Sequence, residues 1–201
     1  AAANNTRLVA AGGGTPSNTD VIDYIIMATL GNAADFGNLT VAKKDTTGTS
    51  NNSRVIFSGG NNPSDASNVI EYATFSTTGN TADFGDLTVA RKNSGNVNSS
   101  TRGVFMGGAT RSNNDTMDYI TTATTGNAID FGNLVAGNSG NRGASNSVRG
   151  VSMGGTAPSV TVTMEYITIA STGNTTDFGD LITAVRGGGV GSNGHGGLVG
   201  G

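Results

Sequence analysis

The chain has 201 residues and a formal net charge of −3; only 12% of its residues are charged, while glycine occupies 33 positions. It has no cysteine, which excludes disulfides and thiolate chemistry, and no basic stripe of the kind that binds nucleic acid. No apolar run approaches the roughly 18 residues that a membrane-spanning helix needs.

The first predicted element is a short apolar run that begins at Arg7 and ends in the pair Gly12-Gly13. Small apolar residues in such a run suit a strand that is buried on both faces. The glycine pair is expected where the backbone takes a positive φ or passes close to a neighbouring segment. A weaker strand rich in Gly, Ser and Asn precedes later copies of this run, as in "KNSGNVNSS" at 92–100.

The next predicted elements are a strand around Tyr24, a turn at Gly31-Asn32 and a short strand that contains "DFG" at 35–37. Gly-Asn is typical turn chemistry. Phe36 and Leu39 are the best candidates for packing one unit against the next, because burial of one Phe is worth roughly 1.5–3 kcal/mol. No helix is predicted, since Gly, Thr, Asn and β-branched residues fall in every candidate window.

These elements occur four times, and their landmarks keep a period near 47 residues. The tyrosines are spaced 48, 47 and 47 residues apart, and a phenylalanine follows each after twelve residues. The landmarks are Tyr24, Tyr72, Tyr119 and Tyr166, with Phe36, Phe84, Phe131 and Phe178. Four short strands in such a unit are typical of a propeller blade. We therefore predict an all-β fold, a β-propeller of about four blades, with a longer array as the open alternative.

The whole chain, 1–201, is predicted to be a single repeat domain. Its units are 7–53, 54–101, 102–148 and 149–194, and a partial closing strand follows at 195–201, where His195 stands in place of the arginine. With these boundaries the chain starts and ends within the same kind of strand. The terminal strands would then join the initial ones and complete a ring of four blades, with one strand left over.

An acidic residue precedes each tyrosine, and an arginine opens each apolar run. The acids are Asp23, Glu71, Asp118 and Glu165, and the arginines are Arg7, Arg54, Arg102 and Arg149. We predict that they form a repeated carboxylate–guanidinium pair that fixes the register between strands. A ring of ligand-binding residues is the alternative interpretation.

The order of an Arg-x-Val-x-x-Gly-Gly strand, a variable loop, an acidic-Tyr pair and an aromatic turn resembles the kelch repeat, with Phe where kelch units usually carry Trp. More narrowly, "EYITIASTGNTTDFGDL" at 165–181 and "RGVFMGG" at 102–108 resemble repeats of tail-fibre-like and other structural proteins of marine bacteriophages. The resemblance covers Arg7 to Gly201. It implies a propeller-like fold and a virion or extracellular setting, but no defined active site.

No catalytic, cofactor or metal site is assigned from the sequence. The carboxylates mostly follow the repeat, and His195 is the only histidine. Asn80, Asp83 and Asp86 offer three side chains to a calcium ion that needs six to eight oxygens, so we expect the aspartate to cap the turn instead. The binding residues are unknown, but the loops that diverge between units are the candidates: 15–21, 61–69, 109–117 and 156–163.

The expected function is that of a non-enzymatic structural or appendage protein of a virion, whose divergent loops contact host-surface glycans. It would need no cofactor, and its partners would be other virion proteins, further copies of itself or cell-surface glycans, not nucleic acid or a membrane. One alternative is a propeller hydrolase or lyase acting on polysaccharide, which needs carboxylates that break the repeat. Another is a kelch-type adaptor, which needs exposed aromatic hot spots.

Overall fold

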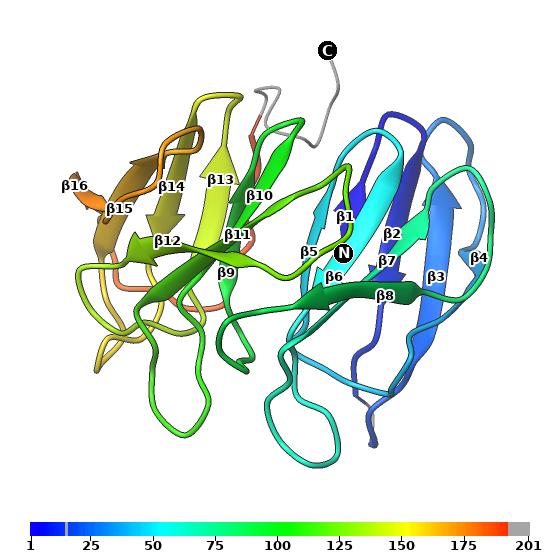
Figure 1. Ribbon diagram of the computed structural model, residues 1–201, viewed down its shortest axis with the longest axis horizontal. Coiled ribbons are helices and arrows are strands. Elements are labelled where there is room, and N and C mark those ends of the chain that lie inside the picture. The colour runs from blue at the N-terminus through cyan, green and yellow to red at the C-terminus, as the bar shows by residue number, and fades with distance from the viewer. Residues whose placement is uncertain (15, 193–201) are drawn as a thin grey trace.

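The computed structural model describes residues 1–14 and 16–192. Within them the chain forms sixteen strands in four antiparallel four-stranded sheets, and no helix that could cross a membrane. The first and fourth sheets lie on opposite sides of the molecule, and the two others lie between them (Figure 1). The predicted all-β class is confirmed, and the arrangement of the sheets is propeller-like.

The strands of every sheet pair in chain order. The first sheet contains β1 (Ala2–Ala3), β2 (Arg7–Ala11), β3 (Val21–Ile26) and β4 (Ala34–Asn38). The second contains β5 (Thr47–Ser50), β6 (Arg54–Ser58), β7 (Val69–Thr74) and β8 (Ala82–Asp86). The third contains β9 (Gly95–Asn98), β10 (Arg102–Met106), β11 (Thr116–Thr121) and β12 (Ile129–Asn133). The fourth contains β13 (Arg142–Ser145), β14 (Arg149–Met153), β15 (Thr163–Thr168) and β16 (Thr176–Asp180).

The first sheet is built differently from the prediction. Ala2 and Ala3 pair with Val9 and Leu8, so this sheet takes its first strand from the residues just before β2. The expectation that the terminal strands complete the initial sheet is therefore wrong, because each sheet is formed by four strands contiguous in the chain. His195 and the predicted closing strand 195–201 lie outside the described residues.

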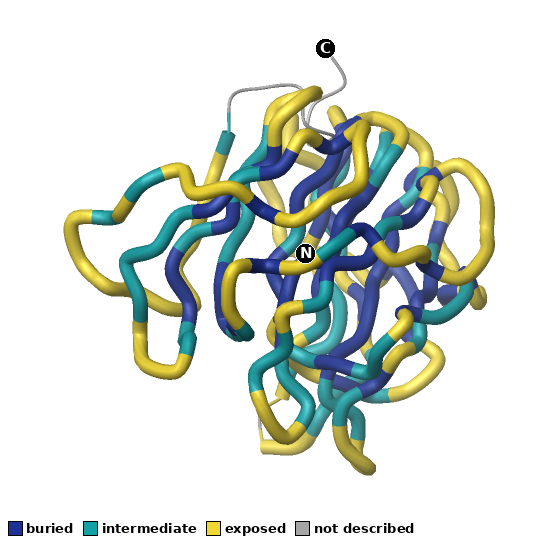
Figure 2. The backbone as a smooth tube through the Cα atoms, turned by 60° about the vertical axis from the view of Figure 1, so that its left-hand side comes forward, coloured by how far each residue is buried: buried dark blue, intermediate teal, exposed yellow. Residues whose placement is uncertain are grey.

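The core lies between neighbouring sheets rather than inside any one of them. The described part of the chain contains three hydrophobic clusters, one at each junction between consecutive sheets. The strands β6 and β10 are almost fully buried, as their small apolar sequences predict, whereas the exposed residues lie mostly in connecting loops (Figure 2). Each sheet thus depends on its neighbour for burial, as expected of a repeat protein.

The Asp-Phe-Gly triplet forms a bulge in the last strand of every sheet. In the second sheet Ile70 pairs with Gly85 and Glu71 pairs with Asp83, which leaves Phe84 between them without a partner. The other three sheets show the same shift of register. Because a bulge re-aims the extra side chain, Phe84 packs into the cluster shared with the third sheet. Gly85 has a φ of 144°, which only glycine adopts without strain.

The glycine pair at the end of each apolar run has the predicted role. In the second sheet Gly59 and Gly60 have φ values of 59° and 105°. The Gly60 N–H donates to the carbonyl of Arg91 at 2.9 Å, and a Cβ on Gly59 would overlap that same carbonyl. The pair therefore fixes the end of the second strand against the segment that leads to the next sheet.

Candidate functional site

Each repeated arginine lies over the ring of the repeated tyrosine, not beside the repeated acid. The guanidinium-to-ring distances are 4.7, 4.7, 4.2 and 4.6 Å for the four units, within the range of cation–π contacts. The tyrosine in turn packs edge-to-face on the phenylalanine of the bulge, with ring centroids 5.8 to 6.0 Å apart. All four tyrosines therefore make the same two contacts, one with an arginine and one with a phenylalanine.

In the first three sheets the arginine also joins its sheet to the next one. Arg54 donates from Nη1 to the carbonyl of Ala123 at 2.8 Å, and Arg102 donates to the carbonyl of Ile169 at 2.9 Å. The predicted carboxylate–guanidinium pair is thus wrong. The arginine instead joins an aromatic stack and the backbone of the following sheet.

The repeated acids reach backward to the preceding sheet. Glu71 forms an ion pair with Lys43, and Asp118 forms one with Arg91 at 2.6 Å; both acids are fully buried. Each also accepts a backbone N–H of the preceding unit, as Glu71 does from Thr40 at 2.8 Å. Glu71, Asp118 and Glu165 are buried at three separate junctions, whereas Asp23 is exposed on the first sheet, so the four acids do not face one common site.

The third junction lacks the cation. Glu165 is 5% exposed and accepts the Val135 N–H at 2.9 Å and the Thr175 hydroxyl, but no described residue forms an ion pair with it. Asn138 stands where the other junctions have Lys43 or Arg91, and its amide donates to the Gly154 carbonyl at 2.8 Å. The signal for these ion pairs in the sequence was a basic residue 28 or 27 positions before the acid. The prediction that the acids pair with the repeated arginines missed it.

The buried ion pair makes the first junction sensitive to acid. Burial alone would raise the pKa of Glu71, but the Lys43 ammonium and the hydrogen bonds from Lys43, Thr40 and Thr81 together hold that pKa below its ordinary value. The ionised carboxylate therefore stabilises the fold at neutral pH, and this contribution is lost as the pH falls through the lowered pKa.

We expect the melting temperature of the chain to fall as the pH is lowered below the ordinary glutamate pKa of about 4.3. The Glu71→Gln variant should be less stable at neutral pH, and its melting temperature should depend less on pH in this range. Thermal unfolding followed by circular dichroism between neutral pH and about pH 3 measures both. Parallel profiles for the two proteins would contradict the assignment.

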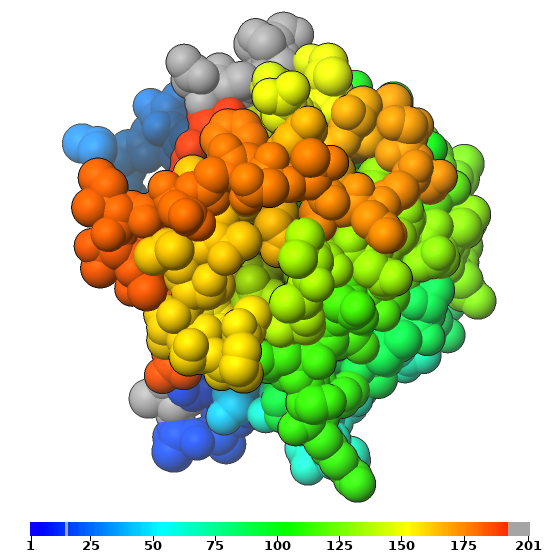
Figure 3. Space-filling model, turned by 90° about the vertical axis from the view of Figure 1, so that its left-hand side faces the viewer, coloured from blue at the N-terminus to red at the C-terminus, as the bar shows by residue number. Residues whose placement is uncertain are grey.

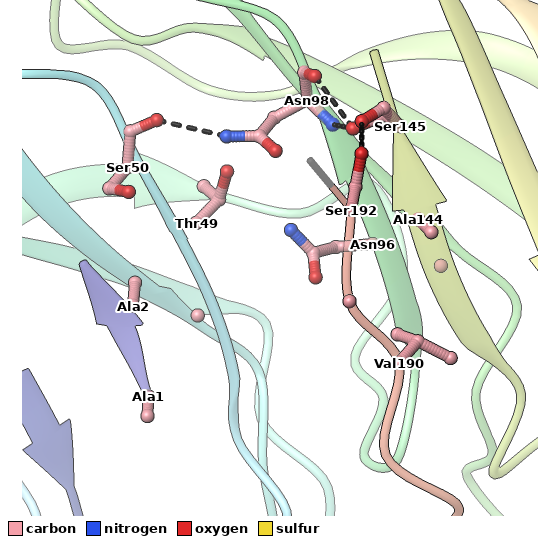
Figure 4. A pocket seen from close by; sticks show the side chains of 13 residues that line it. Ala1, Ala2, Thr49, Ser50, Asn96, Asn98, Ala144, Ser145, Val190 and Ser192 are labelled. Carbon is pink, nitrogen blue, oxygen red and sulfur yellow. Dashed lines mark hydrogen bonds between the residues drawn. The ribbon is translucent and has the colours of Figure 1, made fainter. Parts of the chain in front are cut away.

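A small cavity lies among the first strands of the sheets (Figure 4). Its volume is about 210 Å³, and its lining contains no charged side chain. It is lined by Ala1, Ala2, Gly48, Thr49, Ser50, Asn96, Asn98, Gly143, Ala144, Ser145, Val190, Gly191 and Ser192. The hydroxyl and amide side chains among these residues can donate and accept hydrogen bonds.

The polar side chains around the cavity mainly join one inner strand to the next. Ser50 donates to the carbonyl of Ala3 at 2.7 Å, and Asn98 donates to the carbonyl of Ser50 at 3.0 Å. Ser145 donates to the carbonyl of Asn98, and Ser192 to that of Ser145, both at 2.8 Å. These contacts are framework bonds, repeated every 47 or 48 residues.

The divergent loops form a rim that is fixed at its base and exposed at its tips. The β6–β7 and β10–β11 loops project from the lower end of the molecule in Figure 1. Antiparallel bridges such as Lys44 to Asn61 and Lys92 to Ala109 hold each loop base against the preceding unit. Lys92 also pairs with the exposed Asp65 at 3.3 Å.

The exposed tips differ in chemistry from loop to loop. The second loop presents the acidic Asp65, the third the basic Arg111 and the fourth the apolar Val160. By contrast, the turn that offered calcium ligands is engaged in the framework, because Asn80 accepts the Asn38 N–H at 3.0 Å. Among residues 1–14 and 16–192, no group of three or more His, Cys, Asp or Glu could hold a metal ion.

Comparison with models of known protein families gave no match, and no curated protein of similar sequence was found.

Proposed function

We propose that this chain is a non-enzymatic binding and structural module, built from kelch-like blades of a β-propeller. The observation that carries the proposal is the contrast between frame and loops. The same stack, bulge and turn contacts recur at the three junctions, whereas the exposed loop tips change from Asp65 to Arg111 to Val160. A constant frame with variable loops is the usual division between scaffold and recognition.

The ligand we propose is a cell-surface glycan, contacted by the rim of divergent loops. Hydroxyl and amide groups of Ser, Thr and Asn dominate these loops and match the hydrogen-bonding groups of sugars. Such wet contacts are individually weak, and many copies in an appendage would compensate through avidity. The setting in a virion appendage is supported by the resemblance to bacteriophage structural repeats.

A glycan array probed with the protein displayed at high valency on beads tests this function. We expect binding to a subset of glycans, and a loss of at least about tenfold for Asp65→Ala or Arg111→Ala, because avidity multiplies each weakened contact. Asp83→Ala is the matched control, since Asp83 is exposed on β8 away from the loops. Equal binding by the loop variants, the absence of any bound glycan, or release of oligosaccharides from polysaccharide would contradict the proposal.

A further inference from the structure

The outer face of the fourth sheet is uncovered, although its counterparts in the other sheets are buried. Phe178 is 47% exposed, whereas Phe36, Phe84 and Phe131 are 1 to 2% exposed. A Cβ on Gly179 would meet nothing within 4 Å, whereas one on Gly85 would overlap the backbone of the next sheet. We call Phe178, Gly179, Ile182 and Val185 the leading face; in Figure 3 the segment of β15 and β16 lies at the surface toward the viewer.

At the three internal junctions the corresponding face binds the Gly-Asn turn of the next sheet. At the second junction the Gly126 N–H donates to the Phe84 carbonyl at 2.7 Å. Asn127 accepts the Asp86 N–H through Oδ1 at 3.0 Å. The first and third junctions repeat both bonds with the same geometry.

The first sheet carries the matching turn, and none of the four described sheets lies against it. Its residues Asp23, Ile25, Met27, Leu30, Gly31 and Asn32 are all exposed, and we call them the trailing face. Their counterparts in the second sheet include Glu71, Ala73 and Phe75, which are buried. No described residue donates a hydrogen bond to the Asp23 carboxylate.

The leading face also has a hollow beside it and an arginine whose guanidinium makes no hydrogen bond to a neighbouring sheet in the described part of the chain. A hollow of about 610 Å³ lies beside Phe178 and is lined in part by Arg149 and Val151. Arg149 stacks on Tyr166 like the other repeated arginines, but it donates to no carbonyl among the described residues. At the internal junctions the repeated arginine donates to a carbonyl of the next sheet, as Arg54 does to Ala123 and Arg102 does to Ile169. In the first sheet the equivalent carbonyl belongs to Met27 or to its neighbour.

We propose that the leading face of one copy binds the trailing face of a second copy in the geometry of the internal junctions. Gly31 then donates its N–H to the Phe178 carbonyl, and Asn32 accepts the Asp180 N–H. The Asp23 carboxylate accepts the Ile182 N–H, as Glu71 accepts that of Thr40. The partner is a second copy because both halves of an interface that the molecule already uses three times are left open on one chain.

The two faces differ, so the contact is heterologous. Each copy carries one leading and one trailing face, and association therefore continues head to tail until a ring closes or a filament forms. The contact does not involve the divergent loops of the rim, so it stands independently of glycan binding.

Cross-linking between two single-cysteine variants tests the register of this contact, because the natural chain contains no cysteine. Asp180→Cys and Asn32→Cys should be joined by a short bismaleimide only when the two variants are mixed. The double variant Asn133→Cys/Asn174→Cys provides the control, because these residues meet at an internal junction, where the Asn133 N–H lies 2.9 Å from Asn174 Oδ1. Cross-linking within either single variant, or none in the mixture, would overturn the proposal.

Sedimentation velocity tests the affinity. The apparent molecular mass of the natural chain should rise above the monomer value of 20.0 kDa as the protein concentration increases. Phe178→Asp should raise the dissociation constant at least about tenfold, because it places a charge where an aromatic ring would be buried. Ile129→Asp, which changes an exposed apolar residue outside both faces, should leave association unchanged. A chain that stays monomeric at every concentration, or equal effects of the two variants, would overturn the proposal.

Discussion

Replacing Phe84 with alanine is expected to lower the free energy of unfolding by about 3–5 kcal/mol, whereas Phe178→Ala lowers it by about 1 kcal/mol or less. The two residues hold the same position in the repeat and the same contact with a tyrosine ring. They differ in that Phe84 fills the cluster shared by two sheets, while Phe178 is half exposed. Removal of Phe84 leaves a cavity at a junction, and removal of Phe178 leaves none.

Urea denaturation monitored by circular dichroism measures both changes at a protein concentration low enough to keep the chain monomeric. Phe131→Ala should behave like Phe84→Ala, because Phe131 is equally buried at the third junction. Equal losses for Phe84→Ala and Phe178→Ala would show that the phenylalanine stabilises its own sheet and not the contact between sheets.

Replacing Glu71 with glutamine is expected to cost about 3–5 kcal/mol, because it leaves the Lys43 ammonium buried without a counter-charge. The same replacement at Glu165 should cost only about 1 kcal/mol. Glu165 faces no cation among the described residues, and a glutamine oxygen still accepts the Val135 N–H. The same glutamate-to-glutamine replacement at equivalent positions of the repeat should therefore lower the free energy of unfolding by different amounts.

The double variant Lys43→Met/Glu71→Gln separates charge from packing. It should recover most of the stability lost in Glu71→Gln, since no unpaired charge is then buried. Chemical denaturation at neutral pH measures the free energy of unfolding of the natural chain, Glu71→Gln, Glu165→Gln and the double variant. A double variant as unstable as Glu71→Gln would mean that the carboxylate acts through its hydrogen bonds to Thr40 and Thr81 rather than through Lys43.

The local elements could be predicted because they depend on local chemistry. Gly12-Gly13 and its repeats had to end a strand, since only glycine adopts the positive φ found there. The constant interval from tyrosine to phenylalanine followed from a hairpin of fixed length, in which Tyr72 pairs with Ala82 two residues before Phe84. The prediction that the repeated acids pair with the repeated arginines was wrong, because charge and spacing do not reveal which sheet a side chain faces.

The sequence by itself determined the number of repeated units, the all-β class and the residues that pack between units, because each of these follows from a period and from local preferences. Only the tertiary structure decided which partners meet. It placed Glu71 on Lys43, the Arg54 guanidinium against the Ala123 carbonyl, and Phe178 on an open face. The physical reason is that all these contacts join or flank separate sheets, so they depend on how one sheet is set against the next and not on any order along the chain.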